Sequence, residues 1–129
     1  MNNNRFKFRT PWYLGDRFAG FQYWEFEHGR VKLIGEHWES WVSKRDELTA
    51  KPDEQCTGLK DKKRDLIYEN DIMLGDSGFK YCIIWSEMEL GWVLQNLETR
   101  LCITMNAFTP DELEIIGNVH KQADQKDVK

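Results

Sequence analysis

The chain has 129 residues, of which 40% are hydrophobic and 31% charged, and its formal net charge is −4. That length is enough for one domain with a core of its own, and the acidic balance argues against binding driven mainly by nucleic-acid phosphates. The polar N-terminus and the absence of any run of about 18 apolar residues argue against a signal peptide and a membrane span. We therefore expect a soluble protein of the cytoplasm.

Aromatic residues make up 13% of the sequence and include six Trp. Aromatic richness with few Ala favours strands over helices, so a mainly β fold is expected. The three cysteines, Cys56, Cys82 and Cys102, form no C-x-x-C pair. We expect them to be reduced, buried thiols, because unpaired cysteines usually behave as small apolar residues.

The first third of the chain reads as short strands separated by turns. Alternating or apolar-rich segments predict strands at residues 6–9, 18–26, 31–34 and 38–43. The next stretch, residues 44–54, is charged, contains Pro52 and has one weak helical turn near residues 46–48.

That charged stretch is the best candidate for a domain boundary. We expect an N-terminal β lobe over residues 1–53 and a second lobe over residues 54–120. The polar end of the chain, residues 121–129, has nothing to bury and is expected to be disordered.

The second lobe begins with two turns close together. Gly58 interrupts a strand and suggests a bulge or a close backbone approach. Residues 60–65 are six consecutive charged residues, which favours a hairpin turn, and residues 66–68 return to the core. The segment 69–71 is a second turn, in which Asn70 tolerates a positive φ.

Later strands complete the lobe. They are expected at residues 72–74, 79–86, 92–97, 100–105 and 114–120. The segment 79–86 has no polar side and should be central, and residues 109–112 carry the cap, proline and Glu of a single helical turn. About ten short strands at this spacing predict a small closed barrel.

The order of these motifs resembles the YopX family, small proteins found mainly in bacteriophages and prophages. The family signature T-G-L-x-D-x-N-G-x-x-I-[YF]-E-G-D-I-V is matched from Thr57 to Ile72, and the resemblance extends from residue 7 to residue 119. Lys7-Phe8-Arg9 resembles the opening motif, residues 81–94 resemble a W…G-W hairpin, and residues 114–119 resemble the closing E-I-I-G-N-V. The resemblance implies a small SH3-type barrel, here with the additional N-terminal β lobe and one short helical turn.

Two departures from the family pattern concern the turns. Lys63-Arg64 stands where the family has Asn-Gly, and Asn70 stands where it has Gly. A positive φ costs a non-glycine residue about 1 kcal/mol or more, so the first turn should be looser or of another type. The second turn can keep its shape.

Candidate chemistry is sparse. The three His are scattered and have no metal-ligand spacing with the Cys, so no metal or other cofactor is expected. Glu69 and Asp71 could act as an acid–base pair, but adjacent turn carboxylates usually accept hydrogen bonds from the backbone. Nucleotide-loop, nucleophile-elbow and deaminase motifs are missing, so we expect a non-enzyme without a small-molecule substrate.

The residues expected to contact a partner are basic or aromatic. They are Lys60, Lys62, Lys63, Arg64, Trp12, Trp38 and Trp41. The basic group could contact phosphate or could simply be a solvated turn. The Trp residues are too many for one core to hide completely, so they could form an exposed patch or pack the two lobes together.

Three functions follow from these features. The first is a non-catalytic module of a bacterial host cell that binds another protein or a second copy of itself. Charge is compatible with self-association, because residues 1–64 carry 13 Lys/Arg against 10 Asp/Glu, and residues 65–129 carry 5 against 12. The second is nucleic-acid binding through residues 60–64 and aromatic stacking. The third is an enzyme that uses Glu69 and Asp71; the family resemblance does not choose among the three.

Overall fold

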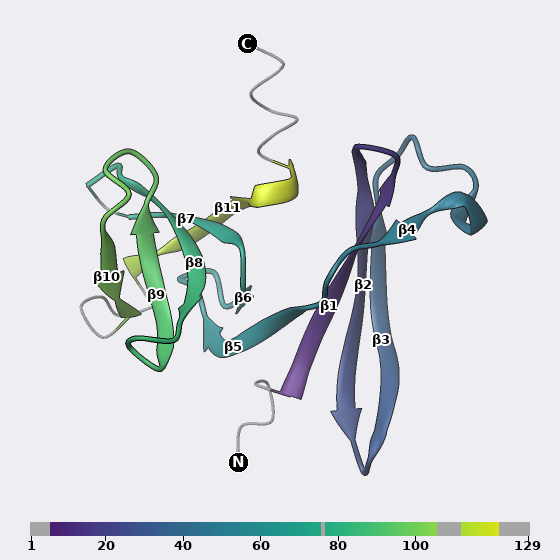
Figure 1. Ribbon diagram of the computed structural model, residues 1–129, viewed down its shortest axis with the longest axis horizontal. Helices are drawn as coiled ribbons and strands as arrows, with labels where there is room; N and C mark the ends of the chain where they lie inside the picture. The colour runs from purple at the N-terminus through teal and green to yellow at the C-terminus, as the bar shows by residue number, and fades with distance from the viewer. Residues whose placement is uncertain (1–5, 76, 106–111, 122–129) are drawn as a thin grey trace. The chain divides into compact units, whose positions relative to one another are not determined.

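The structure, a computed structural model, describes residues 6–75, 77–105 and 112–121 (Figure 1). It is mainly β, as the composition predicts, and its strands form antiparallel sheets. The chain divides into two compact units, residues 1–56 and 57–129. It passes from the first unit to the second within β5 (Glu54–Lys60), a few residues beyond the boundary expected at residue 53.

The first unit is a sheet of long strands with β1 in the middle. β1 (Lys7–Leu14) pairs with β2 (Arg17–Glu27) on one side, and on the other side with β4 (Thr49–Ala50) and the start of β5. β2 pairs in turn with β3 (Arg30–Trp38). The alternating sequence of β1 and β2 therefore forms a hairpin, and β3 extends it.

The β2–β3 turn has the geometry that a tight hairpin needs. His28 and Gly29 have φ of 52° and 75°, and positive φ at both central residues defines a type I′ turn. Residues 38–43 were predicted as a further strand, which is wrong. β3 ends at Trp38, and Val42 N–H donates to the Glu39 carbonyl at 3.0 Å, which turns the chain instead.

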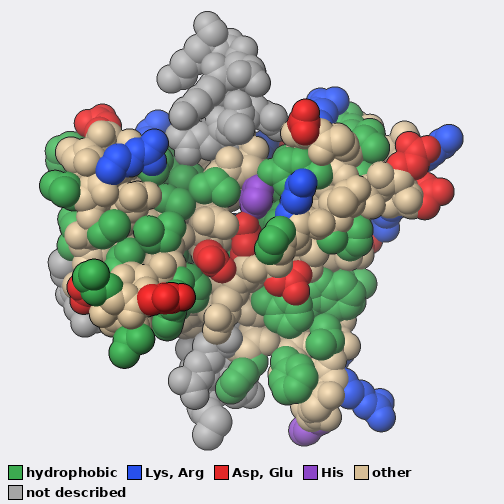
Figure 2. Space-filling view, viewed as in Figure 1, with side chains coloured by type: hydrophobic (Ala, Val, Ile, Leu, Met, Phe, Trp, Pro, Cys, Tyr) green, Lys and Arg blue, Asp and Glu red, His purple; other side chains and the backbone are tan. Residues whose placement is uncertain are grey.

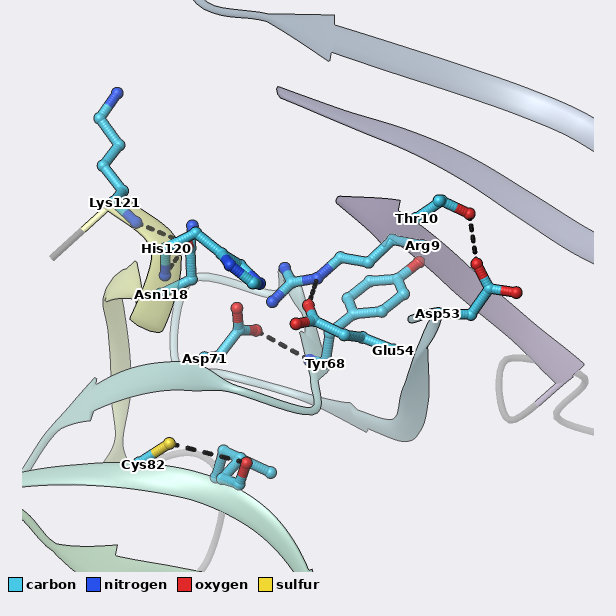
Figure 3. A network of polar contacts seen from close by, with 11 residues as sticks. Arg9, Thr10, Asp53, Glu54, Tyr68, Asp71, Cys82, Asn118, His120 and Lys121 are labelled. Atoms are coloured by element: carbon cyan, nitrogen blue, oxygen red, sulfur yellow. Dashed lines mark hydrogen bonds and ion pairs between the residues drawn. The ribbon is translucent and has the colours of Figure 1, made fainter. Parts of the chain in front are cut away.

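A buried ion pair fixes the start of β5 against β1. Arg9 Nε lies 2.7 Å from Glu54 Oε1, and both side chains are almost fully buried (Figure 3). The Arg9 guanidinium also lies 4.1 Å from the centre of the Phe21 ring. Beside this pair, Thr10 Oγ1 donates to Asp53 Oδ1 at 2.5 Å. These side-chain bonds reinforce a two-residue backbone pairing that would be weak by itself.

The second unit is built on a meander. β8 (Lys80–Ser86), β9 (Gly91–Asn96) and β10 (Cys102–Thr104) follow one another as antiparallel neighbours, as predicted. β7 (Asp71–Leu74) pairs with the other edge of β8, and β11 (Glu114–Asn118) pairs with β7. β8 is thus central, in agreement with its two apolar faces.

The core of the second unit lies under the meander. Its fully buried members come from four strands and from the segment before β11. They are Ile67 of β6 (Leu66–Tyr68), Met73, Tyr81, Ile83, Leu94 and Leu113. β6 lies next to β5 and delivers its middle residue to this core, as expected for the return from the charged turn.

Several finer expectations meet different outcomes. The strand order β10-β9-β8-β7-β11 is open, so closure into an SH3-type barrel stays a prediction.

The weak helical turn expected near residue 46 is confirmed as the 3-10 helix η2 (Arg45–Glu47). The helical turn expected at residues 109–112 lies mostly outside the described residues. β11 ends at Asn118, two residues earlier than predicted, and residues 119–121 are helical.

The cysteines are thiols, and only two of them are buried. Cys56 and Cys82 are buried as predicted, but Cys102 is exposed. The prediction for Cys102 is wrong because β10 is at the end of the described strand order, with a neighbour on one side only.

Candidate binding surface

The predicted basic contact residues gather at the turn between β5 and β6. Lys60 and Arg64 are exposed, and Lys62 and Lys63 place their ammonium groups 3.5 and 3.3 Å from the Glu114 carboxylate. Two of the cations therefore share one acidic partner from β11. This arrangement lowers the positive charge available to a phosphate group.

Asp61 organises that turn from inside. Its side chain is 1% exposed, and its carboxylate accepts hydrogen bonds from the backbone N–H groups of Lys63, Asp65 and Ile115 at 2.9–3.0 Å. The turn is further closed by Arg64 N–H donating to the Asp61 carbonyl at 2.9 Å. Arg64 has a φ of 72°, so the position of the family's turn glycine keeps its left-handed backbone here. The turn is of another type, as one of the two expectations had it, because Lys63 has no positive φ and the two residues therefore do not form a type I′ turn. It is not looser, because the buried carboxylate holds the loop closed.

The second turn is also held by a buried carboxylate. Asn70 has a φ of 71°, which confirms that the turn keeps its shape without glycine. Asp71 is 2% exposed and accepts from Tyr68 N–H at 2.8 Å (Figure 3). Asn70 N–H donates to the Ile83 carbonyl, and its own carbonyl accepts from Val119 N–H. Asp71 thus has the backbone-binding role expected of a turn carboxylate, whereas Glu69 is half-buried.

Trp12 and Trp38 lie on the two strands that flank β2, each paired with Gly20. Gly20 pairs with Trp12 of β1 and with Trp38 of β3, so the two indoles flank it on one face of the sheet. Both side chains are half-buried, and their indole N–H groups are buried without a hydrogen-bond partner. Such donors are costly to bury. The two Trp are therefore partly covered in this sheet, and their contact role stays a prediction.

Trp41 lies apart from this pair, in the segment after β3. It is half-buried, with the Arg17 guanidinium 4.1 Å from the centre of its ring. It also lines a small hollow of about 100 Å³ together with Leu14 and Val42. The predicted contact residues consequently fall into three places: the Trp12–Trp38 pair, Trp41, and the basic turn of the second unit.

Glu36, next to Trp38, provides a test of the electrostatics of this sheet. Gln22 Nε2 donates to its carboxylate at 3.3 Å and lowers the pKa of Glu36 below its ordinary value. The Trp38 indole N–H acts in the same direction without reaching hydrogen-bond geometry, and Arg45 adds an ion pair at 2.6 Å.

A lowered pKa means that the folded state favours the charged carboxylate. The contribution of Glu36 to stability is then present above the pKa of the unfolded chain and is lost as the pH falls through the folded value. We expect Glu36→Gln to be slightly less stable than the unsubstituted protein at neutral pH, and the gap to close in acid, because the group is exposed and its ion pair is weak. Urea unfolding across this pH range measures the gap; a gap that widened in acid would contradict the assignment.

The large exposed hydrophobic side chains do not include Trp12, Trp38 or Trp41, which the sequence singled out. Among the described residues only Trp85 is an exposed Trp, at 47%. The most exposed members lie in the turns of the second unit: Met88 at 92%, Leu90 at 80% and Leu101 at 69%. The three most exposed large hydrophobic side chains are thus a Met and two Leu, and an aromatic contact patch stays a prediction.

Met88 and Leu90 stand at the end of the β8–β9 hairpin beside a groove of about 320 Å³. The groove is lined by Leu59, Glu89, Leu90, Gly91, Trp92, Thr104 and Met105. Trp92 connects it to the core, and the Trp85 ring lies 5.2 Å from the Trp92 ring in an edge-on contact. This groove is called the hairpin groove below.

The backbone at Leu90 has a conformation that leucine rarely adopts. Its φ is 52°, in the left-handed region that costs a non-glycine residue about 1 kcal/mol or more. Leu90 gains little from burial in return, since 80% of its side chain is exposed. Strained backbone positions tend to cluster at binding and switch sites.

Sequence reasoning treated residues 87–91 only as a turn. The signal was present nonetheless, because Glu87-Met88-Glu89-Leu90 alternates acids with large apolar residues where turns usually carry Gly, Asn or Asp. Two apolar side chains in a hairpin turn cannot reach the core of their own sheet. They are exposed or bound to something else.

The features above define a mainly β protein with an apolar surface groove and two turns held by buried aspartates. In the part of the chain that the structure describes, no group of His, Cys, Asp or Glu could hold a metal ion. No helix among those residues is long and apolar enough to cross a membrane.

Comparison with known families agrees with the motif order. The sequence matches the family described as YopX protein over residues 23–124. The chain therefore belongs to the YopX family, as the signature in residues 57–72 indicated. No curated protein matches the chain.

Proposed function

We propose that this YopX-family protein is a non-catalytic binding module of phage or prophage origin that acts in the cytoplasm of a bacterial host. It binds an apolar segment of a protein in the hairpin groove. The observation that carries the proposal is Leu90, an exposed leucine with a strained backbone in the lining of the groove.

The groove has the properties of a protein-binding site. Its apolar lining comes from three parts of the second unit, through Leu59 of β5, Trp92 of β9 and Met105 after β10. Contiguous exposed apolar surface on a folded protein marks interaction sites, and aromatic and Met side chains are enriched at their centres. A segment that covers Met88 and Leu90 would also remove the most exposed apolar surface of this unit from water.

The test separates binding from folding at a single residue. Asn tolerates the left-handed region, so Leu90→Asn should leave stability unchanged or raise it by about 1 kcal/mol. Peptides selected from a random library on the unsubstituted protein should bind this variant at least tenfold more weakly, as measured by calorimetry.

Leu101→Asn is the matched control, because Leu101 is an exposed leucine of the same unit outside the groove lining. Selected peptides should bind it as they bind the unsubstituted protein. A library that yields no binding peptide, or peptides that do not distinguish Leu90→Asn from Leu101→Asn, would contradict the proposal.

The two other functions have less support. The ion pairs of Lys62 and Lys63 with Glu114 and the acids within the turn weaken the case for a phosphate site. An acid–base role for Glu69 and Asp71 has to compete with the hydrogen bond that Asp71 accepts from Tyr68 N–H. Neither residue lines the hairpin groove.

A further inference from the structure

The far end of the β2–β3 hairpin has one apolar face and one charged face, as the strand register shows. Phe26 pairs with Val31, and Trp24 pairs with Leu33, so one face of this end is apolar. Phe26, Val31 and Leu33 are 52%, 56% and 44% exposed. Figure 2 shows hydrophobic side chains gathered over the lower end of the sheet formed by β1, β2 and β3.

The opposite face of the same hairpin end is charged. Glu25 pairs with Lys32, and Glu27 pairs with Arg30. The two cations lie on β3, which is the outermost strand of the described sheet, and the two acids lie one strand further in. A partner that approaches this edge therefore meets Arg30 and Lys32 first, with Val31 and Leu33 alternating between them.

The hairpin groove of the second unit has the complementary composition. Its lining includes the exposed Glu89 and Leu90, and the exposed Glu87 and Met88 precede them in the same turn. Protein–protein contacts usually have apolar residues at the centre, and at the rim the charges of one partner face opposite charges of the other. A basic–apolar strand edge thus fits an acidic–apolar groove.

We propose that the partner segment bound in the hairpin groove is the β3 edge of a second copy of this chain, residues 30–33. This inference rests on the proposed function, because it names the occupant of the same groove. Two different surfaces of each copy meet, so the contact is heterologous and produces rings or open chains rather than closed pairs. Residues 1–64 carry more Lys and Arg than Asp and Glu, whereas residues 65–129 carry more Asp and Glu than Lys and Arg. This difference in net charge favours the same head-to-tail orientation.

The contact is small, and weak association is expected. One strand edge and one groove fall at the low end of interface sizes, below about 1,200 Å² of total buried area. Sedimentation velocity of the full chain at low salt should show species larger than a dimer as the protein concentration rises. Added salt should reduce them, because rim charges are screened.

Charge reversal provides the decisive test. The Glu87→Lys/Glu89→Lys and Arg30→Glu/Lys32→Glu variants should each associate at least tenfold more weakly, because like charges then face each other. An equal mixture of the two variants should associate again, since each reversed surface meets its opposite on the other variant. Circular dichroism and thermal unfolding of each variant establish that the fold is retained.

The matched control is Glu98→Lys/Glu112→Lys, which changes the net charge by the same amount at two exposed acids of the second unit. It should associate like the unsubstituted protein. Equal weakening by this control, or a mixture that stays monomeric, would overturn the inference. A chain that is monomeric at every concentration while its groove binds library peptides would overturn the inference and leave the proposed function standing; a monomer that binds no peptide would contradict both.

Discussion

Replacing Asp61 with Ala should lower the free energy of unfolding of the second unit by about 3 kcal/mol or more. The carboxylate is 1% exposed and accepts three backbone hydrogen bonds, from Lys63, Asp65 and Ile115. Each hydrogen bond to a charged group contributes about 1.5–3 kcal/mol. The substitution leaves three partly buried donors without their partner and also disconnects the β5–β6 turn from β11. Urea unfolding followed by Trp fluorescence measures the loss.

Asp65→Ala is the control for this prediction. Asp65 is the same residue type in the same turn, but its side chain is exposed. Exposed substitutions away from such networks usually change stability by no more than about 0.5 kcal/mol. If both variants lost a similar amount of stability, the loss would come from the charge of aspartate or from its preference for turns. The hydrogen bonds to the Asp61 carboxylate would then not be its cause.

Gly20→Ala should destabilise the first unit by about 3 kcal/mol or more. A β-carbon there would overlap the His37 carbonyl oxygen and lie 2.8 Å from Cε3 and 2.9 Å from Cα of Trp38. The obstacle is mostly backbone of the neighbouring strand, which can yield only by opening the β2–β3 pairing. Overpacking costs about 1–3 kcal/mol, occasionally more, and the φ of 152° adds strain for alanine.

Gly35→Ala serves as the comparison within the same strand pair. No atom lies within 4 Å of the position that its β-carbon would take, and Gly35 has no positive φ. It should change the free energy of unfolding by less than 1 kcal/mol, as surface substitutions usually do. Thermal unfolding of the two variants side by side measures the difference, and equal stability would show that β3 moves aside at no cost.

Sequence patterns predicted those elements whose structure depends only on residues close together in the chain. The turn at residues 60–65 follows from a run of six charged residues, even though one of them, Asp61, is buried inside the turn, and the central position of β8 follows from its two apolar faces. The left-handed Asn70 follows from side-chain chemistry within a single turn. In each case the information lies within a few residues of the structure that it predicts.

The binding surface could not be predicted in this way. Whether a Trp is buried depends on which residues face it across the sheet, and Trp12 and Trp38 both pair with Gly20. The most exposed apolar side chains are instead Met88 and Leu90, in a turn whose unusual residues are a local signal but do not by themselves show where a groove opens.

The sequence by itself determined the class of fold, the family and the positions of the turns, because strand propensity, alternation and turn chemistry act between near neighbours in the chain. Only the tertiary structure decided which carboxylate is buried, which aromatic residues are covered and where the apolar groove opens. Those properties depend on contacts such as that between Asp61 and Ile115, which are 54 residues apart and meet only when the strands have paired.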